Sequence, residues 1–121
     1  MEETKKIFLS GPMTGIEKFN FPKFDFYETA ITEHYPTVSV VNPANIARKY
    51  KVEEVLADKH VFDKMIIEEL QSLMDCDAIL LFDGWESSEG AKKELLFALQ
   101  LGKRVILEKD MLRFENKGES K

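Results

Sequence analysis

Residues 77–95, DAILLFDGWESSEGAKKEL, read as a strand, a turn and the start of a helix. The consecutive apolar residues 78–82 are typical of a strand that is buried on both faces. Residues 83–85 (DGW) end the apolar run as a turn does. Ser87 or Ser88 is then a suitable N-cap for the helix. A strand buried on both faces needs a helical layer on each side, so this stretch predicts a parallel sheet between helices.

The same alternation of strand and helix continues along the chain. Short apolar runs bounded by turn residues predict three further strands, at 7–9, 38–41 and 105–107. Apolar residues at helical spacing predict helices from Pro22, behind Asn20 as the cap, to about 34, from 61 to about 74, and from the serine cap to about 101. Residues 46–58 are polar, and we expect a short helix and a loop there. Together the pattern predicts an α/β three-layer sandwich with a central parallel sheet.

Composition limits the classes of function. The 121 residues fit a single domain, 1–121, with an ordered core of about 5–112 and a polar C-terminal tail. The formal net charge of −5 argues against a nucleic-acid polymer as partner. The one cysteine, Cys76, permits no intramolecular disulfide, and it is either inert core or a reactive thiol. No signal peptide and no apolar run of membrane-spanning length is present, so we expect a soluble, cytoplasmic protein without a membrane partner.

Two glutamates fall on the inward sides of their predicted helices. On a helical wheel Glu94 lies on the flank of the stripe made by Ala91, Leu95 and Ala98, and Glu69 lies within the apolar stripe of the preceding helix. Burying an ionised carboxylate is costly unless it is paired or hydrogen-bonded. Each glutamate therefore either extends to a solvent-exposed edge, pairs with a lysine such as Lys64 or Lys103, or lines a cleft. In a cleft, paired carboxylates suit chemistry at an anomeric carbon, and both are candidate catalytic residues.

The candidate binding residues follow strands. Ligands of parallel sheets bind at the carboxyl ends of the strands, where the segments 10–15, 42–45 and 83–94 would meet. The candidate substrate-binding residues in and beside these segments are Ser10, Gly11, Pro12, Met13, Gly15, Phe19, Asn42, Gly84, Trp85, Ser88 and Gly90.

Each of these residues also has a structural explanation. The 10–15 loop, with two glycines, is either a close approach to a ligand or an ordinary strand-to-helix turn. Phe19 and Trp85 either stack on a base or pack in the core or an interface. Ser88 is either a simple N-cap or an anion ligand at a helix N-terminus. His34 and His60 have no partners at metal spacing, and we expect neither a metal nor another cofactor.

Leu96 and Phe97 face away from the inward stripe of the last helix. A helix that is apolar on more than one side is buried by more than its own sheet. We therefore expect a homodimer or higher homo-oligomer formed through this helix.

Several motifs in fixed order resemble a known family. They are IFLSGPMTG at 7–15, FNFPKF at 19–24, VNPA at 41–44, LQSLMDCDA at 70–78 and GWESSEGAKKEL at 84–95. Together they resemble the nucleoside 2-deoxyribosyltransferase-like proteins, a small bacterial and phage branch related to 2′-deoxynucleoside 5′-phosphate N-hydrolases. The resemblance covers roughly residues 6–107 and implies a flavodoxin-like fold, cleavage of the bond between sugar and base, and oligomers.

The resemblance also implies roles for individual residues. In the relatives' S/D-x-G-x-x-x-E pattern, here residues 88–94, Glu94 matches the nucleophile and Ser88 matches the residue that contacts a 5′-phosphate. The 10–15 loop matches a segment that lines the substrate site. Two positions differ: Phe8 stands where relatives have a tyrosine, and Glu69 where they have an aspartate.

Three functions therefore stay open from the sequence. The first is an enzyme that cleaves or transfers at the N-glycosidic bond of a (deoxy)nucleoside or its 5′-monophosphate. The second, favoured by Phe8 and Glu69, is a non-catalytic nucleotide-binding or sensing module with a degenerate active site. The third is a purely structural oligomer, which two inward carboxylates make less attractive.

Overall fold

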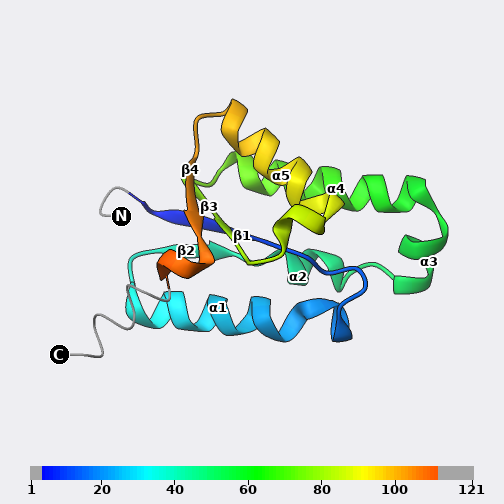
Figure 1. The fold of residues 1–121 in the computed structure, drawn as a ribbon, viewed down its shortest axis with the longest axis horizontal. Coiled ribbons are helices and arrows are strands. Elements are labelled where there is room, and N and C mark those ends of the chain that lie inside the picture. Colours follow the sequence, from blue (N-terminus) through cyan, green and yellow to red (C-terminus); the bar gives the residue numbers. More distant parts are fainter. Residues whose placement is uncertain (1–3, 112–121) are drawn as a thin grey trace.

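A four-stranded parallel sheet forms the centre of the molecule, with helices on both faces (Figure 1). The computed structural model describes residues 4–111, except for the side chain of residue 52. The strands are β1 (Lys6–Ser10), β2 (Ser39–Val41), β3 (Ala78–Leu81) and β4 (Arg104–Leu107). The α-helices are α1 (Phe21–His34), α2 (Pro43–Ala47), α3 (Val52–Ala57), α4 (Lys59–Met74) and α5 (Glu89–Gln100). Two short 3₁₀ helices are η1 (Glu17–Asn20) and η2 (Trp85–Ser87).

The strand order is β2-β1-β3-β4, and every pairing is parallel. In the register Phe8 of β1 lies between Val41 of β2 and Ile79 of β3. This order makes the chain a flavodoxin-like three-layer sandwich and confirms the predicted fold class. The direction in which strands are added reverses between β1 and β3, so the carboxyl ends of these two strands border the crevice in which such sheets bind ligands.

The side chains of β1 alternate between two hydrophobic clusters. Ile7 and Leu9 pack with Phe24 and Ile31 of α1, on the face that α1 covers. Phe8 packs with Leu73 of α4 and with Ala98 of α5, on the opposite face. Ser10 has the same parity as Phe8 and therefore faces the α4–α5 layer. Figure 1 shows α1 on one side of the sheet and α4 and α5 on the other.

Three helices begin where a polar side chain caps them. Asn42 accepts a hydrogen bond from the Ala44 N–H at 3.0 Å and starts α2. Ser88 accepts one from the Ala91 N–H at 3.1 Å and starts α5, as predicted. Asp58 accepts one from the His60 N–H at 2.9 Å, so α4 begins two residues before its predicted start. The polar segment 46–58 forms the end of α2, a short connection and α3, which is more helix than we predicted.

Asn20 stands at the N-cap position of α1, as predicted, but its side chain does not cap the helix. Asn20 precedes α1, but its backbone is left-handed, with φ 62°, and its side chain makes no capping bond. Its Nδ2 instead donates to the carbonyl oxygen of Pro12 at 2.9 Å. The side chain therefore ties the start of α1 to the loop after β1, because a partner distant in sequence has taken the place of the local one.

The exposure of side chains at the surface was also predicted only in part. Leu96 on α5 is 60% exposed, as predicted, whereas Phe97 packs against the sheet cluster, so its predicted outward orientation is wrong. His34 and His60 are exposed. Within residues 4–111 no helix combines the length and apolarity needed to cross a membrane. The predicted end of the ordered core near residue 112 lies outside the described residues.

Candidate active site

A pocket of about 960 Å³ opens at the carboxyl ends of the first three strands. Its walls include residues 11–14 after β1, Pro43 after β2, and residues 83–84 after β3. The helical layer adds the end of α3, one side of α4 and the N-terminal turns of α5. The pocket therefore lies at the reversal in strand order, and its volume is in the range of small-molecule sites.

Glu69 and Glu94 both line this pocket and are nevertheless almost fully buried. Their exposed fractions are 3% and 4%. The predicted inward orientation of both glutamates is therefore confirmed. Among the described residues neither forms an ion pair, and Lys103 instead donates to the carbonyl oxygen of Met74. The alternative that a lysine neutralises each glutamate thus does not hold within residues 4–111.

The two carboxyl groups lie close enough to act on each other's ionisation. Burial raises the pKa of Glu69 well above its ordinary value of 4.5, and the adjacent charge and hydrogen bond of Glu94 raise the pKa further. Burial also raises the pKa of Glu94, but hydrogen bonds from Glu69 and Ser10 act in the opposite direction. The Ser10 hydroxyl donates to Glu94, and none of the described residues donates to Glu69, which favours Glu94 as the member that ionises first. Oε2 of Glu69 has no hydrogen-bond partner among the described residues.

Ser10 makes the direct contact with Glu94 from the sheet. Its Oγ donates to Oε1 of Glu94 at 2.5 Å, and the serine is 1% exposed. Ser10 is not among the residues that line the pocket, so it reaches the site through Glu94. Phe8, two residues earlier on the same face, has no exposed surface and packs among apolar side chains.

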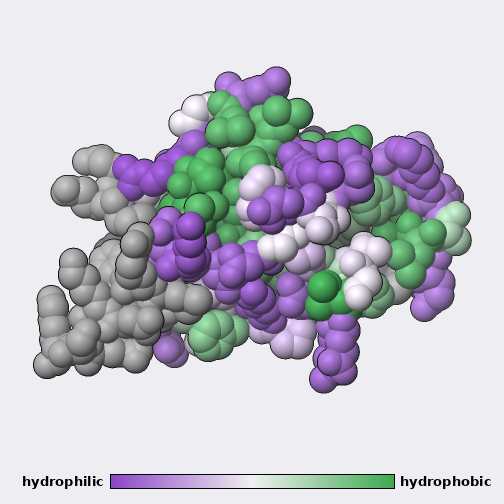
Figure 2. Space-filling model, in the orientation of Figure 1, coloured by the Kyte–Doolittle hydropathy of each residue, from purple (hydrophilic) through white to green (hydrophobic). Residues whose placement is uncertain are grey.

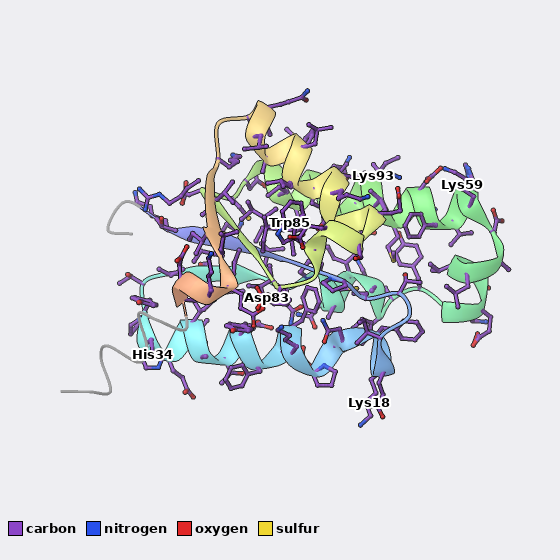
Figure 3. All side chains as sticks on the ribbon, in the orientation of Figure 1. Lys18, His34, Lys59, Asp83, Trp85 and Lys93 are labelled. Atoms are coloured by element: carbon purple, nitrogen blue, oxygen red, sulfur yellow. The ribbon has the colours of Figure 1, made fainter. Side chains whose placement is uncertain are left out.

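The wall of the pocket includes a helix N-terminus and two lysines, together with the carboxylates of Asp83 and Glu89. Ser88 and residues 89–91 of α5 line the pocket, and a helix N-terminus presents free N–H groups and a positive partial charge. Lys59 and Lys93 also line it, and Figure 3 shows both on the helical layer made by α4 and α5. The Lys93 Nζ lies 5.7 Å from the ring centre of Phe62, while Lys59 pairs with Asp63. The helix N-terminus and the two lysines are groups that suit an anion.

The predicted site residues divide into three groups. Those that line the pocket are Glu69, Glu94, Gly11, Pro12, Met13, Gly84, Ser88 and Gly90. Ser10 lies behind Glu94. The four that do not line the pocket are Gly15, Phe19, Asn42 and Trp85.

These four residues have structural roles outside the pocket. Asn42 caps α2 and donates to Asp25 and Glu28. Trp85 packs against the cluster on the α4–α5 face, and the Phe19 ring lies 6.0 Å from that of Phe21. Gly15 has a positive φ of 84° in open space, which is the ordinary role of a turn glycine.

The loop after β1 requires a glycine at its first position. A Cβ on Gly11 would lie 2.7 Å from Cβ of Phe82, which follows β3. The two loops that border the pocket thus touch directly, and a side chain at Gly11 would force them apart.

The loop after β3 is fixed by a glutamate that the sequence analysis missed. Glu108 is 5% exposed and accepts hydrogen bonds from the Asp83 N–H at 2.8 Å and the Tyr27 hydroxyl at 2.9 Å, with Lys23 at 2.9 Å. Burial raises the pKa of Glu108, but these donors outweigh burial and hold the pKa below its ordinary value. Figure 3 shows Asp83 on the side of the sheet nearest α1. No local signal identified this role, because all three partners lie far away in sequence.

Six apolar residues on the pocket wall were not predicted as site residues. Val55, Leu56 and Ala57 of α3 line it, together with Phe62, Met65 and Ile66 of α4. The stripe on α4 predicted burial for the last three, but no pattern indicated that α3 lies beside them. Leu56 is 60% exposed although it lines the pocket, so an apolar surface is available to a ligand there.

Neither a metal centre nor a reactive thiol emerges from the described residues. Residues 4–111 contain no group of three side chains that could hold a metal ion. Cys76 is 1% exposed, and burial raises the pKa of its thiol to about 11. A thiol with this pKa is protonated at neutral pH, which agrees with an inert core cysteine.

Comparison with known proteins identifies the family but no activity. The chain belongs to the family described as "Domain of unknown function (DUF4406)", which matches residues 5–107. None of the curated proteins matches the chain.

The protonated Glu69 predicts a specific pH dependence of stability. The folded chain keeps this proton at pH values where the unfolded chain, with a pKa near 4.5, has lost it. The resulting stabilisation is complete below that value and disappears as pH rises through the folded pKa, with a slope of up to about 1.4 kcal/mol per pH unit. The glutamine of Glu69→Gln is uncharged at every pH. The free energy of unfolding of this variant, measured with urea, should therefore increase relative to that of the wild type as pH rises.

The neighbouring Glu68 is the matched control. Hydrogen bonds from Lys49 and Tyr50 lower the pKa of Glu68, so Glu68→Gln should instead lose stability relative to the wild type above its ordinary pKa. A difference between Glu69→Gln and wild type that does not change with pH would contradict a buried, protonated Glu69.

Proposed function

We propose that this member of the family cleaves or transfers at the N-glycosidic bond of a (deoxy)nucleoside or nucleoside 5′-monophosphate. The observation that carries the proposal is the pair of buried carboxyl groups, Glu69 and Glu94, on the wall of a pocket at the carboxyl end of the sheet. One member keeps its proton and the other ionises first. Two carboxyl groups with different protonation states are the arrangement that glycosidic cleavage uses.

The two glutamates would have separate roles. Glu94 attacks C1′ of the sugar, or stabilises the positive charge that develops there, as the bond from C1′ to the base nitrogen breaks. Glu69 supplies a proton to the departing base or donates a hydrogen bond to a sugar hydroxyl. Water then accepts the sugar in a hydrolase, whereas a second base accepts it in a transferase. The resemblance to nucleoside 2-deoxyribosyltransferase-like proteins supports the same assignment of Glu94.

The pocket offers groups that suit a phosphate and apolar surface that suits a base. Ser88, the N-terminus of α5 and Lys93 supply hydrogen-bond donors and positive charge for a 5′-phosphate. Met13 and Phe62 offer apolar surface for a base at the same pocket. The protein carries a net charge of −5, so this local positive charge favours a small anion over a polymer.

A panel of nucleosides and 5′-monophosphates tests the chemistry. We expect free base to be released from at least one compound, as measured by chromatography. Glu94→Gln should lower this rate by about 10³-fold or more, since it removes the nucleophile while keeping the volume of the side chain. Glu86→Gln, which changes an exposed glutamate outside the pocket, should retain the wild-type rate.

The same panel separates the enzyme from a binding module. Phe8 and Glu69, which differ from the relatives' residues, favour a non-catalytic nucleotide-binding or sensing protein as the second candidate. A nucleotide that raises the melting temperature and is recovered intact would support the module. Release of base at an equal rate by Glu94→Gln would count against the proposed enzyme mechanism.

Ser88→Asp tests the phosphate end of the pocket. Aspartate caps helices as well as serine does, so stability should be preserved. Its negative charge should repel a 5′-phosphate and raise the KM for a monophosphate about tenfold or more, while the KM for the nucleoside changes little. An equal effect on both substrates would show that Ser88 does not distinguish them.

We also infer a cytoplasmic homodimer or higher homo-oligomer. Leu96, Leu99 and Leu101 are each exposed by 47% or more, and Figure 2 shows an apolar area over the C-terminal half of α5 and β4. An apolar area of this kind on a small protein favours association.

Light scattering tests the association. We expect a mass of at least twice 14.0 kDa at micromolar concentration. The double variant Leu96→Lys, Leu99→Lys should reduce this mass to that of the monomer. Phe26→Lys, at an equally exposed position on α1, should leave the mass unchanged. A monomeric wild-type protein would contradict the inference.

A further inference from the structure

Glu94 receives a hydroxyl hydrogen bond from the sheet. Oγ of Ser10 lies 2.5 Å from Oε1 of Glu94, and both side chains are buried. Ser10 is the last residue of β1, where strand pairing with β3 fixes its backbone opposite Leu81. A short side chain on a fixed strand loses little freedom when it forms this bond, so Ser10 holds Glu94 from a rigid support.

No other hydroxyl among the described residues makes this contact. Phe8 lies on the same face of β1, but it has no polar atom in its side chain and is enclosed by Leu73, Ile79 and Ala98. Glu69 also acts on Glu94, but a carboxyl group donates only while it carries a proton. Ser10 is thus the hydroxyl donor that Glu94 has within residues 4–111.

A donor that contacts only one member of a carboxyl pair makes the pair unequal. A hydroxyl donates more strongly to a carboxylate than to a neutral acid, so it favours ionisation of the group it touches. Among residues 4–111 Glu69 receives no such donor, and its buried Oε2 has no partner there. Further titratable groups near the pair are Glu68 on α4 and Tyr50 after α2. Glu68 acts on Glu69 and raises its pKa further, and Glu69 in turn raises that of Tyr50.

We infer that Ser10 is a positioning residue. Its hydroxyl keeps Glu94 as the ionised member of the pair and leaves the proton on Glu69. Its hydroxyl occupies one oxygen of Glu94 and limits rotation of the carboxyl group. Ser10 thereby supplies from β1 a hydroxyl that Phe8 cannot provide. The charge assignment does not depend on the proposed function, whereas its consequence for catalysis rests on that function.

Carbon-13 NMR titration of the glutamate carboxyl groups tests the charge assignment without any substrate. Glu69→Gln and Glu94→Gln assign the two signals. In the wild type, Glu94 should titrate at lower pH than Glu69. Ser10→Ala should raise the pKa of Glu94 by about one unit, since it removes a hydrogen bond to a charged group. An unchanged Glu94 titration in a folded Ser10→Ala variant would overturn the inference, as would a wild-type Glu69 that ionises first.

Two further variants separate the hydrogen bond from packing. Ser10→Cys preserves most of the volume with a weak donor and should shift the Glu94 titration in the same direction as alanine. Ser10→Thr retains the hydroxyl and should restore the wild-type titration. If urea unfolding shows lower stability for Ala and Cys but neither titration moves, Ser10 has a packing role only and the inference fails.

Kinetics provide the second readout. Ser10→Ala should lower kcat about 10-fold or more with little change in KM, and the acidic limb of kcat/KM should move to higher pH. If Ser10→Ala has the kcat of the wild type and the acidic limb of its kcat/KM profile does not move, the positioning role is contradicted. If the wild type releases no base from any compound, the proposed function fails, and the NMR titration still decides the role of Ser10.

Discussion

The rest of the site depends on the proximity of the Glu69 and Glu94 carboxyl groups, because it determines the charge of the pair. The helical layer buries both groups, and neither has an ion-pair partner within the described residues. Two adjacent negative charges in such surroundings repel each other strongly, so one proton stays in the pair. The pair is therefore asymmetric in charge before any ligand arrives. Such an arrangement costs stability, and this cost is typical of sites built for chemistry rather than for packing.

The sheet topology brings the two glutamates to the same place. Glu69 belongs to α4, which precedes β3, and Glu94 belongs to α5, which follows it. Both helices lie on the same face of the sheet, so their inward sides converge beside β1 and β3. The strand order reverses at this point, which leaves a crevice between the loops that follow the two strands. The site is thus a consequence of the layer arrangement, with loops completing its walls.

Supporting contacts hold those loops in fixed positions. Gly11 allows the loop after β1 to touch Phe82, and Asn20 ties the same loop to the start of α1. Glu108, which directly follows β4, fixes the loop after β3. Asn20 and Glu108 make their contacts from outside the pocket, and the contact at Gly11 is possible because glycine has no side chain. They show why a site of this size needs the whole domain, since each wall is held by a different element.

Helical periodicity was sufficient to place Glu69 and Glu94 on inward faces, because a wheel depends only on local geometry. The same reasoning located α1, α4 and α5, and short apolar runs located the buried strands. It failed at Phe97, which packs against the sheet cluster, and the side chain of the cap residue Asn20 bonds to the loop after β1 rather than to the helix. Lys59, Lys93 and the α3 wall were missed for a related reason. Long or exposed side chains carry no periodic signal that identifies the pocket beside them.

The sequence by itself determined the class of fold and the inward placement of two carboxylates, since both follow from repeating local patterns that the backbone enforces. Only the tertiary structure decided that these carboxyl groups meet each other without a lysine, and that Ser10 donates to one of them. Those facts depend on contacts between β1, α4 and α5, which are separated by dozens of residues along the chain. Charge and hydrogen bonding in a buried site are set by which atoms lie within about 3 Å of each other, and local patterns do not specify such distances.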